Sequence, residues 1–254
     1  MIFNCKKCKG VFNCDKHDIY TSTCTCNSTY KFYRTPEFLK WLDIWDEECK
    51  NWVIYKNSFY RFFSQSAIRV FPELNKTIIE EKVLELGCGN GRTFNYNLFR
   101  YYYGVDINHK SLQHFKKYYP SAKLFQSSLN TLPFDDNSFS KVICFHTLEH
   151  LYDIASCLEE IHRILKPGGK FYYAIPTEGT FLWSIGRFFL TRPHLKKQYN
   201  LSCSHVMYRE HINDYKRVLK FLDFYFIKSL RYWPLCFIKC ASFNSLIYGI
   251  CTKE

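Results

Sequence analysis

The sequence predicts an α/β fold: a doubly wound, mostly parallel sheet with helices on both faces. Short apolar runs alternate with helical segments between residues 82 and 176, which is the pattern of parallel strands joined by crossover helices. A turn rich in glycine directly follows the first of these runs. Sheets of this kind bind their ligands at the carboxyl ends of the strands, so we expect the functional site at that edge.

The individual elements follow from the apolar runs and from the residues that end them. Seven strands are expected, at 83–86, 101–106, 122–126, 141–145, 170–175, 225–232 and 245–251. Three helices are expected among them, at 111–119, 147–165 and 212–222. The first of these helices stops at Pro120 and the second at Lys166-Pro167-Gly168-Gly169, because proline and glycine end helices. Residues 36–80 carry apolar stripes at helical spacing and are expected to form N-terminal helices.

The composition is that of a globular chain with a basic surface. Hydrophobic residues make up 47% of the 254 residues, which excludes a disordered tail or a charged binding arm. The net charge of +12 favours anionic partners, such as RNA, an acidic membrane surface or a phosphorylated substrate. No apolar run reaches the roughly 18 residues of a transmembrane segment, and the start lacks a signal peptide. We therefore expect a cytoplasmic protein whose thirteen cysteines are mostly reduced thiols.

The strongest motif is the glycine loop after the first strand, Leu84-Glu85-Leu86-Gly87-Cys88-Gly89-Asn90-Gly91. Glycines at this position let the chain turn tightly and let a ligand approach the backbone. Asp106 lies 19 residues beyond Gly87, at the end of the next strand, where a carboxylate can accept hydrogen bonds from both hydroxyls of a ribose. The glycine spacing differs from that of dinucleotide-binding enzymes. These features together predict a nucleoside-containing cofactor.

Five motifs in order make residues 80–176 resemble the class I S-adenosylmethionine-dependent methyltransferases, in particular the methyltransferase type 11 family. They are the glycine loop 83–91, Gly104-Val105-Asp106-Ile107, the link 132–139, the segment 146–151 and Leu165-Lys166-Pro167-Gly168-Gly169-Lys170. The resemblance implies a Rossmann-like seven-stranded sheet and S-adenosyl-L-methionine as cofactor. It implies cofactor contacts at Glu85, Gly87, Cys88, Gly89, Gly91, Asp106, Ile107, Ser128, Leu129, Phe145 and His146. Ser128 stands where many relatives carry Asp, so the contact to the adenine differs here.

Three histidines are candidates for the base that takes a proton from the methyl acceptor: His146, His150 and His211. His146 is the first choice, because it directly follows the fourth strand. His146, Glu149 and His150 also have the i, i+3 and i+4 spacing of metal ligands on one helix face. The family resemblance implies that this segment lies beside the cofactor without a metal, so we expect none here.

The N-terminal residues 1–35 are rich in cysteine and resemble a zinc ribbon found before some type 11 methyltransferases. Cys5 and Cys8 form a C-x2-C pair, and Cys24 and Cys26 are the expected second pair of ligands, although their spacing is tighter than in a standard knuckle. Cys14 and His17 offer substitutes for ligands of this pair. A cysteine-rich segment without metal is the alternative. Residues 36–254 are expected to form the methyltransferase domain, with helices at 36–80, a cofactor core at 81–176, a substrate cap at 177–215 and a final helix and strands at 216–254.

The cap combines aromatic and basic side chains, namely Phe181, Leu182, Trp183, Phe188, Phe189, Arg187, Arg192, Lys196, Lys197 and Arg209. This mixture suits an acceptor that is partly apolar and partly anionic. We expect methyl transfer to an oxygen or nitrogen of a small-molecule, sugar or lipid-linked acceptor, with peripheral contact to an acidic membrane. An RNA methyltransferase that docks through the ribbon is the alternative. The intact glycine loop and Asp106 argue against a third hypothesis, a binding protein that lost its activity.

Overall fold

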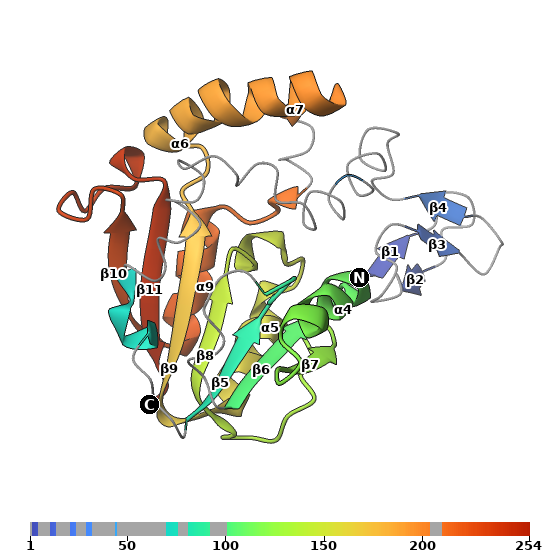
Figure 1. Cartoon of the computed structure of the whole chain (residues 1–254), viewed down its shortest axis with the longest axis vertical. Coiled ribbons are helices and arrows are strands. Elements are labelled where there is room, and N and C mark those ends of the chain that lie inside the picture. The colour runs from blue at the N-terminus through green and yellow to red at the C-terminus, as the bar shows by residue number, and fades with distance from the viewer. Residues whose placement is uncertain are drawn as a thin grey trace.

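The structure, a computed structural model, describes residues 2–4, 11–13, 21–23, 29–31, 44, 70–75, 81–91, 101–203 and 210–254. Its centre is a seven-stranded sheet with the strand order β10-β11-β9-β8-β5-β6-β7 (Figure 1). This confirms the expected α/β class and the number of strands. Among the described residues, no helix combines the length and the apolar character that a membrane-spanning segment needs.

Five strands of the sheet are parallel: β5 (Lys82–Leu86), β6 (Tyr101–Asp106), β7 (Lys123–Gln126), β8 (Phe139–Phe145) and β9 (Leu165–Pro176). β11 (Leu246–Thr252) runs antiparallel between β9 and β10 (Ile227–Trp233). β5 pairs with both β6 and β8, so the order of the strands reverses at β5. The carboxyl ends of β5, β6 and β8 therefore meet at the switch point, where such sheets bind ligands.

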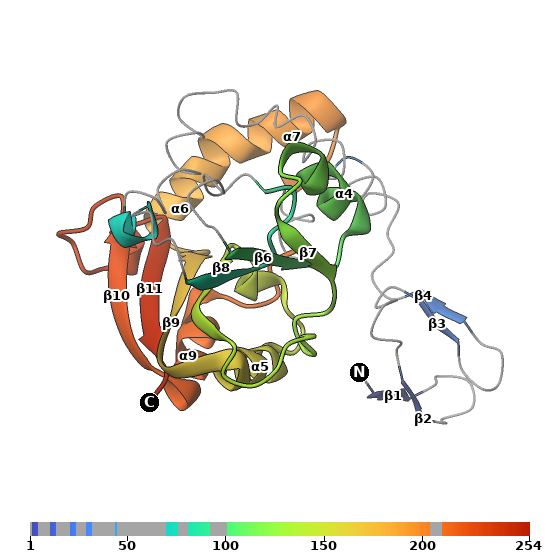
Figure 2. The same cartoon turned by 60° about the horizontal axis from the view of Figure 1, so that its bottom comes forward.

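Helices cover both faces of the sheet, as expected from the alternation of strands and helices. α5 (Ile154–Ile164) and α9 (Tyr215–Tyr225) contribute to one apolar core, and α4 (His109–Tyr118) contributes to the core on the opposite face (Figure 2). Each helix begins after a side-chain cap: Asn108, Asp153 and Asp214 each accept a hydrogen bond from a backbone N–H of the first turn. These caps fix where the loops at the carboxyl edge end.

The segment after β8 differs from the single helix expected at 147–165. It forms a short 3-10 turn, η4 (Leu148–His150), and α5 begins only at Ile154. Asp153 accepts a hydrogen bond from the backbone N–H of Ser156 (3.1 Å), and this cap starts a separate helix. α9 also begins later than expected, because the N–H groups of Ile212 and Asn213 donate to the carbonyl of Glu149 instead (2.8 and 3.0 Å).

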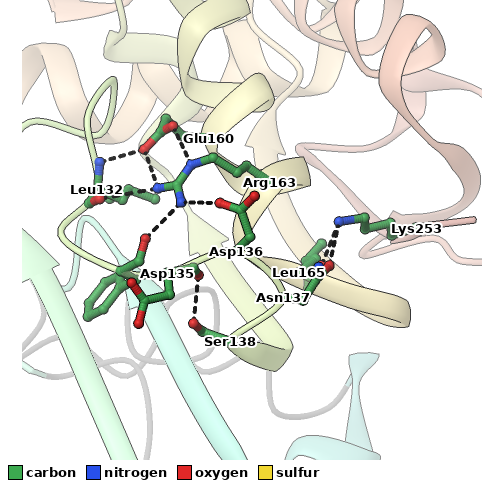
Figure 3. Close-up of polar contacts among 10 residues, drawn as sticks. Leu132, Asp135, Asp136, Asn137, Ser138, Glu160, Arg163, Leu165 and Lys253 are labelled. Carbon is green, nitrogen blue, oxygen red and sulfur yellow. Dashed lines mark hydrogen bonds and ion pairs between the residues drawn. The ribbon is translucent and has the colours of Figure 1, made fainter.

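The link 132–139 before β8 is tied to α5 by one arginine (Figure 3). Arg163 donates through Nε and Nη2 to the carboxylate of Glu160 (2.8 and 2.9 Å) and through Nη1 to Asp136 (2.8 Å) and the carbonyl of Phe134 (2.8 Å). Glu160 in turn accepts from the N–H of Leu132 (2.7 Å). The network holds the chain at the amino end of β8, the edge opposite the expected site.

After β9 the chain forms one continuous helical stretch beyond the carboxyl end of that strand (Figure 1). It consists of α6 (Phe181–Gly186), a π-helical turn η5 (Arg187–Thr191) and α7 (Arg192–Tyr199). Residues 181–199 of the expected cap, 177–215, form this stretch. Shorter 3-10 turns are η2 (Pro72–Asn75) and η6 (Ala241–Phe243).

The N-terminal part contains two short antiparallel strand pairs. β1 (Ile2–Asn4) pairs with β2 (Val11–Asn13), and β3 (Thr21–Thr23) pairs with β4 (Thr29–Lys31). The four expected zinc ligands, Cys5, Cys8, Cys24 and Cys26, lie outside the described residues. So do nearly all of the helices expected at 36–80.

Candidate active site at the carboxyl ends of the strands

The glycine loop turns sharply after β5 and packs against the segment that follows β8. The N–H groups of Gly87 and Cys88 donate to the carbonyl of Val105 (2.8 and 3.1 Å). Gly87 has φ +68°, and a Cβ built there would lie 2.2 Å from Oγ1 of Thr147. Only glycine fits this position. Gly89 has φ +51°, and a Cβ there would meet nothing within 4 Å, so the loop leaves open space on that side.

Asp106 lies at the end of β6, next to the glycine loop. Its Oδ2 accepts a hydrogen bond from the N–H of Gly89 (2.8 Å) and its Oδ1 accepts one from the N–H of Asn108 (2.8 Å). Burial raises the pKa of Asp106 above its usual value, while the backbone N–H groups of Asn108, Gly89 and Ile107 oppose that effect. Each carboxylate oxygen can accept a further hydrogen bond, so the group is oriented and retains acceptor capacity for two hydroxyls.

The other predicted cofactor residues separate into two groups. Side chains of Glu85, Ile107 and Ser128 lie at the carboxyl edge. Glu85 is 2% exposed and accepts from the hydroxyl of Tyr102 (2.5 Å), Ile107 is 56% exposed, and the hydroxyl of Ser128 accepts from the N–H of Asn130 (3.3 Å). An apolar, exposed side chain next to Asp106 suits the adenine face of a nucleoside.

In the second group the side chain points into the protein. Cys88, Leu129 and Phe145 are buried in the two cores, and Phe145 packs against Phe71 and Tyr248. A Cβ on Gly91 would strike the ring of Phe115 at 2.5 Å. The side chains of Cys88, Leu129 and Phe145 pack mainly in the protein cores, a distinction that a motif does not reveal.

S-adenosylmethionine fits the chemistry of this edge. The oriented carboxylate of Asp106 matches a ribose, the open side of Gly89 admits a ligand against the backbone, and Ile107 offers an apolar contact. Asp106 and the glycine loop are the residues that would hold it.

His146 lies directly beyond the end of β8, as predicted. Its backbone has φ +53°, a conformation that costs energy for a residue with a side chain and is often found at functional sites. The backbone N–H donates to the carbonyl of Ala174 (3.0 Å), which holds the residue against β9. Its side chain is 44% exposed, and Nδ1 lies 3.9 Å from Oε1 of Glu149.

The structure brings the other two predicted histidines to the same place. The rings of His150 and His211 meet edge to face, with 4.8 Å between their centroids. Nε2 of His150 lies 4.0 Å from Oε1 of Glu149, and Nδ1 of His211 lies 2.8 Å from Oε2 of Glu178. Three histidines and two carboxylates therefore gather at the end of β8.

The site perturbs the ionisation of these groups in opposite directions. Burial raises the pKa of Glu149 to about 7 and, together with the nearby His211, lowers that of His150 to about 3. The surrounding protein and His211 lower the pKa of His146 to about 4. The pKa of His211 lies above its usual value although burial opposes this, because Glu178 and Glu149 favour the charged ring.

Two candidate site residues, Glu178 and Asn213, were not predicted from the sequence. Glu178 follows β9 by two residues and reaches His211, but no motif marks it. Asn213 is 2% exposed, and its Nδ2 donates to the carbonyls of Leu148 (3.1 Å) and Leu151 (2.6 Å). The His-x-Asn pattern of residues 211–213 was the sequence signal for Asn213. The two hydrogen bonds of Asn213 hold the chain next to His211 in place.

Comparisons with known proteins agree with this geometry. The family model for the type 11 methyltransferase domain matches residues 84–173. YrhH of Bacillus subtilis, which is named as a methyltransferase, is 31% identical over 144 residues, 49% of this chain and 77% of the relative. The 2-phytyl-1,4-naphtoquinone methyltransferase of Nostoc punctiforme is 36% identical over 99 residues, 34% of this chain and 43% of the relative.

Solved structures show the same fold. An S-adenosylmethionine-dependent methyltransferase of Thermotoga maritima aligns with 86% of this chain and 100% of its own, with a TM-score of 0.60 and 18% identity. The chain spans less than half of the length of several of the curated relatives it matches. From the ordered motifs, the sheet topology and the relative of which it covers more than two thirds, the chain belongs to the class I S-adenosylmethionine-dependent methyltransferases, in the type 11 family.

Proposed function

We propose that this methyltransferase transfers a methyl group to an oxygen or nitrogen of a small-molecule, sugar or lipid-linked acceptor. The observation that carries the proposal is the group of three histidines at the end of β8. The contact between Gly87 and Thr147 places these residues beside the glycine loop. Acceptor oxygens and nitrogens must lose a proton as they are methylated, and imidazole is a suitable base near pH 7.

S-adenosylmethionine supplies a methyl group that its sulfonium already activates. The protein therefore has to bind, align and deprotonate. Asp106 binds the ribose and fixes the position of the cofactor. His146 takes the proton: its side chain is 44% exposed at the end of β8, and its pKa, lowered from the usual value, leaves the ring neutral at pH 7. His211 is less suited as the base, because the ion pair with Glu178 favours its protonated form.

The cap supports an acceptor with an apolar part. Phe181, Ile185, Phe188 and Phe189 are exposed by 64, 38, 56 and 68% on the helical stretch α6–α7. Basic residues continue the same stretch, and Arg187 and Arg192 lie over the rings of Trp183 and Phe188. Aromatic and basic side chains together suit a lipid with an anionic head, presented at a membrane surface. The name of the Nostoc relative states a phytyl naphthoquinone, which has a long apolar chain.

RNA is the second candidate acceptor, because the net charge of +12 favours a polyanion. A protein that neutralises many phosphates loses affinity steeply as salt rises, whereas an apolar acceptor keeps its affinity. Salt dependence therefore separates the two classes.

The test is a transfer assay with radiolabelled S-adenosylmethionine and fractionated cell extract. Lipid, polar small-molecule and RNA fractions are incubated with the wild-type protein and with Asp106→Ala. We expect label in the lipid or small-molecule fraction, lost in the variant and little affected by salt. Label confined to RNA would assign the second candidate. Tight cofactor binding without transfer to any fraction would favour a binding protein.

A further inference from the structure

We propose that Glu149, His150 and His211 bind one divalent metal ion beside the cofactor site. One ligand atom of each of the three side chains lies within 4.8 Å of the others. They come from two segments: Glu149 and His150 from η4, and His211 from the chain before α9. The metal site itself stands apart from the proposed function; only its role toward the acceptor rests on that function.

The hydrogen bonds of His150 leave a nitrogen lone pair directed into this site. Its Nδ1 lies 2.7 Å from the carbonyl oxygen of Glu210. A carbonyl can only accept, so Nδ1 carries the proton and Nε2 has a free lone pair. Nε2 faces Oε1 of Glu149 at 4.0 Å. Two acceptors that lie this close to each other can share one bound cation.

Glu149 also has an acceptor atom without a hydrogen-bond partner among the described residues. Its side chain is 3% exposed, and its Oε2 is buried with no hydrogen-bond partner among the described residues. A buried carboxylate oxygen without a hydrogen bond is costly, and a bound cation reduces that cost. The backbone of Glu149 is held firmly, since its carbonyl accepts from the N–H groups of Ile212 and Asn213. The fold therefore holds the carboxylate in place while Oε2 lacks a hydrogen-bond partner in the part of the chain that the structure describes.

Each of the two histidines has a second polar partner outside the proposed set of ligands, as histidines in known metal sites do. The Glu210 carbonyl fixes the ring of His150, and the Glu178 carboxylate lies 2.8 Å from Nδ1 of His211. Such second partners set the tautomer and orientation of metal-binding histidines. A metal takes the place of a proton on His211, as it does on any histidine ligand.

The donor set indicates the class of metal. Two imidazoles and one carboxylate suit Zn²⁺, Mn²⁺ or Fe²⁺ better than Ca²⁺. Metal–ligand bonds of about 2.0–2.2 Å place neighbouring tetrahedral ligands roughly 3.3–3.6 Å apart, so the ligand atoms, which lie 4.0 Å apart for Glu149 and His150 and within 4.8 Å of one another overall, must move closer when the metal binds. Three protein ligands leave coordination positions open, and these can hold an oxygen of the acceptor near the transferred methyl group.

Mn²⁺ is the probe for the test, because it prefers oxygen and imidazole to the thiolates of the N-terminal cysteines. Calorimetry and electron paramagnetic resonance count the bound Mn²⁺ in wild type, Glu149→Gln and His211→Ala. We expect one Mn²⁺ per chain in wild type and at least a 100-fold loss of affinity in both variants. His162→Ala, which removes a histidine in the last turn of α5, and Cys5→Ser/Cys8→Ser are the controls and should bind as wild type.

Thermal melting without metal is the control that shows whether the variants fold. Glu149→Gln removes a buried charge and should melt no lower than wild type, but it should lose the rise in melting temperature that Mn²⁺ gives to wild type. The proposal is overturned if wild type binds no Mn²⁺ at millimolar concentration, or if Glu149→Gln and His211→Ala bind it unchanged. Calorimetry with S-adenosylmethionine is run in parallel, so a failure of cofactor binding is distinguished from a failure of the metal site.

Discussion

Gly87 occupies a position where both space and backbone conformation demand glycine. A side chain there must adopt φ +68° and meet Thr147 at 2.2 Å. We predict that Gly87→Ala lowers the free energy of unfolding by about 2–4 kcal/mol, from left-handed strain and overpacking together. Gly89→Ala is the matched control, since it meets no atom within 4 Å. It should cost only about 1–2 kcal/mol of stability but weaken cofactor binding. Urea unfolding measures the stability and calorimetry measures the cofactor affinity. Equal losses of stability in Gly87→Ala and Gly89→Ala would contradict the packing argument.

Asp106 is the side chain that we propose binds the ribose of the cofactor. Its two oxygens are already oriented by the N–H groups of Gly89 and Asn108. We predict that Asp106→Ala weakens S-adenosylmethionine binding by about 2–3 kcal/mol, because two charge-assisted hydrogen bonds are lost. Calorimetry measures the affinity. Unchanged binding in the variant would remove Asp106 from the cofactor site.

His146 is the residue that we expect to act as base. We predict that His146→Ala lowers turnover at saturating cofactor by about 10²–10⁴-fold, the usual contribution of a general base, while cofactor affinity stays near the wild-type value. Because His146 has φ +53°, His146→Asn is a useful control: asparagine tolerates this conformation but cannot take the proton. Near-wild-type turnover in both variants would mean that alignment alone carries the rate.

At the scale of elements, Arg163 joins the link before β8 to α5 (Figure 3). Its guanidinium reaches Glu160, Asp136 and a backbone carbonyl at once, which a lysine ammonium cannot do. We predict that Arg163→Lys lowers the free energy of unfolding by about 1–3 kcal/mol and leaves cofactor affinity unchanged, because the network lies at the opposite edge of the sheet. Thermal melting and calorimetry test this. A large loss of cofactor affinity would show that the two edges are coupled.

The whole chain combines the methyltransferase fold with a cysteine-rich N-terminal part. We predict one zinc ion per chain bound by Cys5, Cys8, Cys24 and Cys26, which follow β1 and β3 in the sequence. Elemental analysis of protein prepared under reducing conditions measures it, and chelator should lower the melting temperature. Cys5→Ser/Cys8→Ser should remove this zinc and leave any metal at Glu149 in place. Zinc absent from wild type, with melting insensitive to chelator, would contradict the prediction.

The sequence by itself determined the fold class, the seven strands and the cofactor loop. Periodicity and stop signals are local, so β5, β6 and β8 appear within one or two residues of their expected bounds. The glycine loop and Asp106 were recognisable because they are adjacent to strand ends. The break between η4 and α5 was not predicted, since the apolar spacing continues through it and the cap at Asp153 decides where α5 begins.

Only the tertiary structure decided which side chains meet. His150 and His211 are 61 residues apart in the sequence, yet their rings are in contact because Asn213 and the backbone N–H groups of 212–213 bind the chain around Glu149. The spacing of His146, Glu149 and His150 pointed to one helix face, but that segment forms no regular helix, and the fold replaces His146 with His211 in the cluster. Cys88 and Phe145 were likewise predicted as cofactor contacts, but their side chains face the core. A local pattern fixes the type of an element; the direction of each side chain depends on packing between elements distant in the chain.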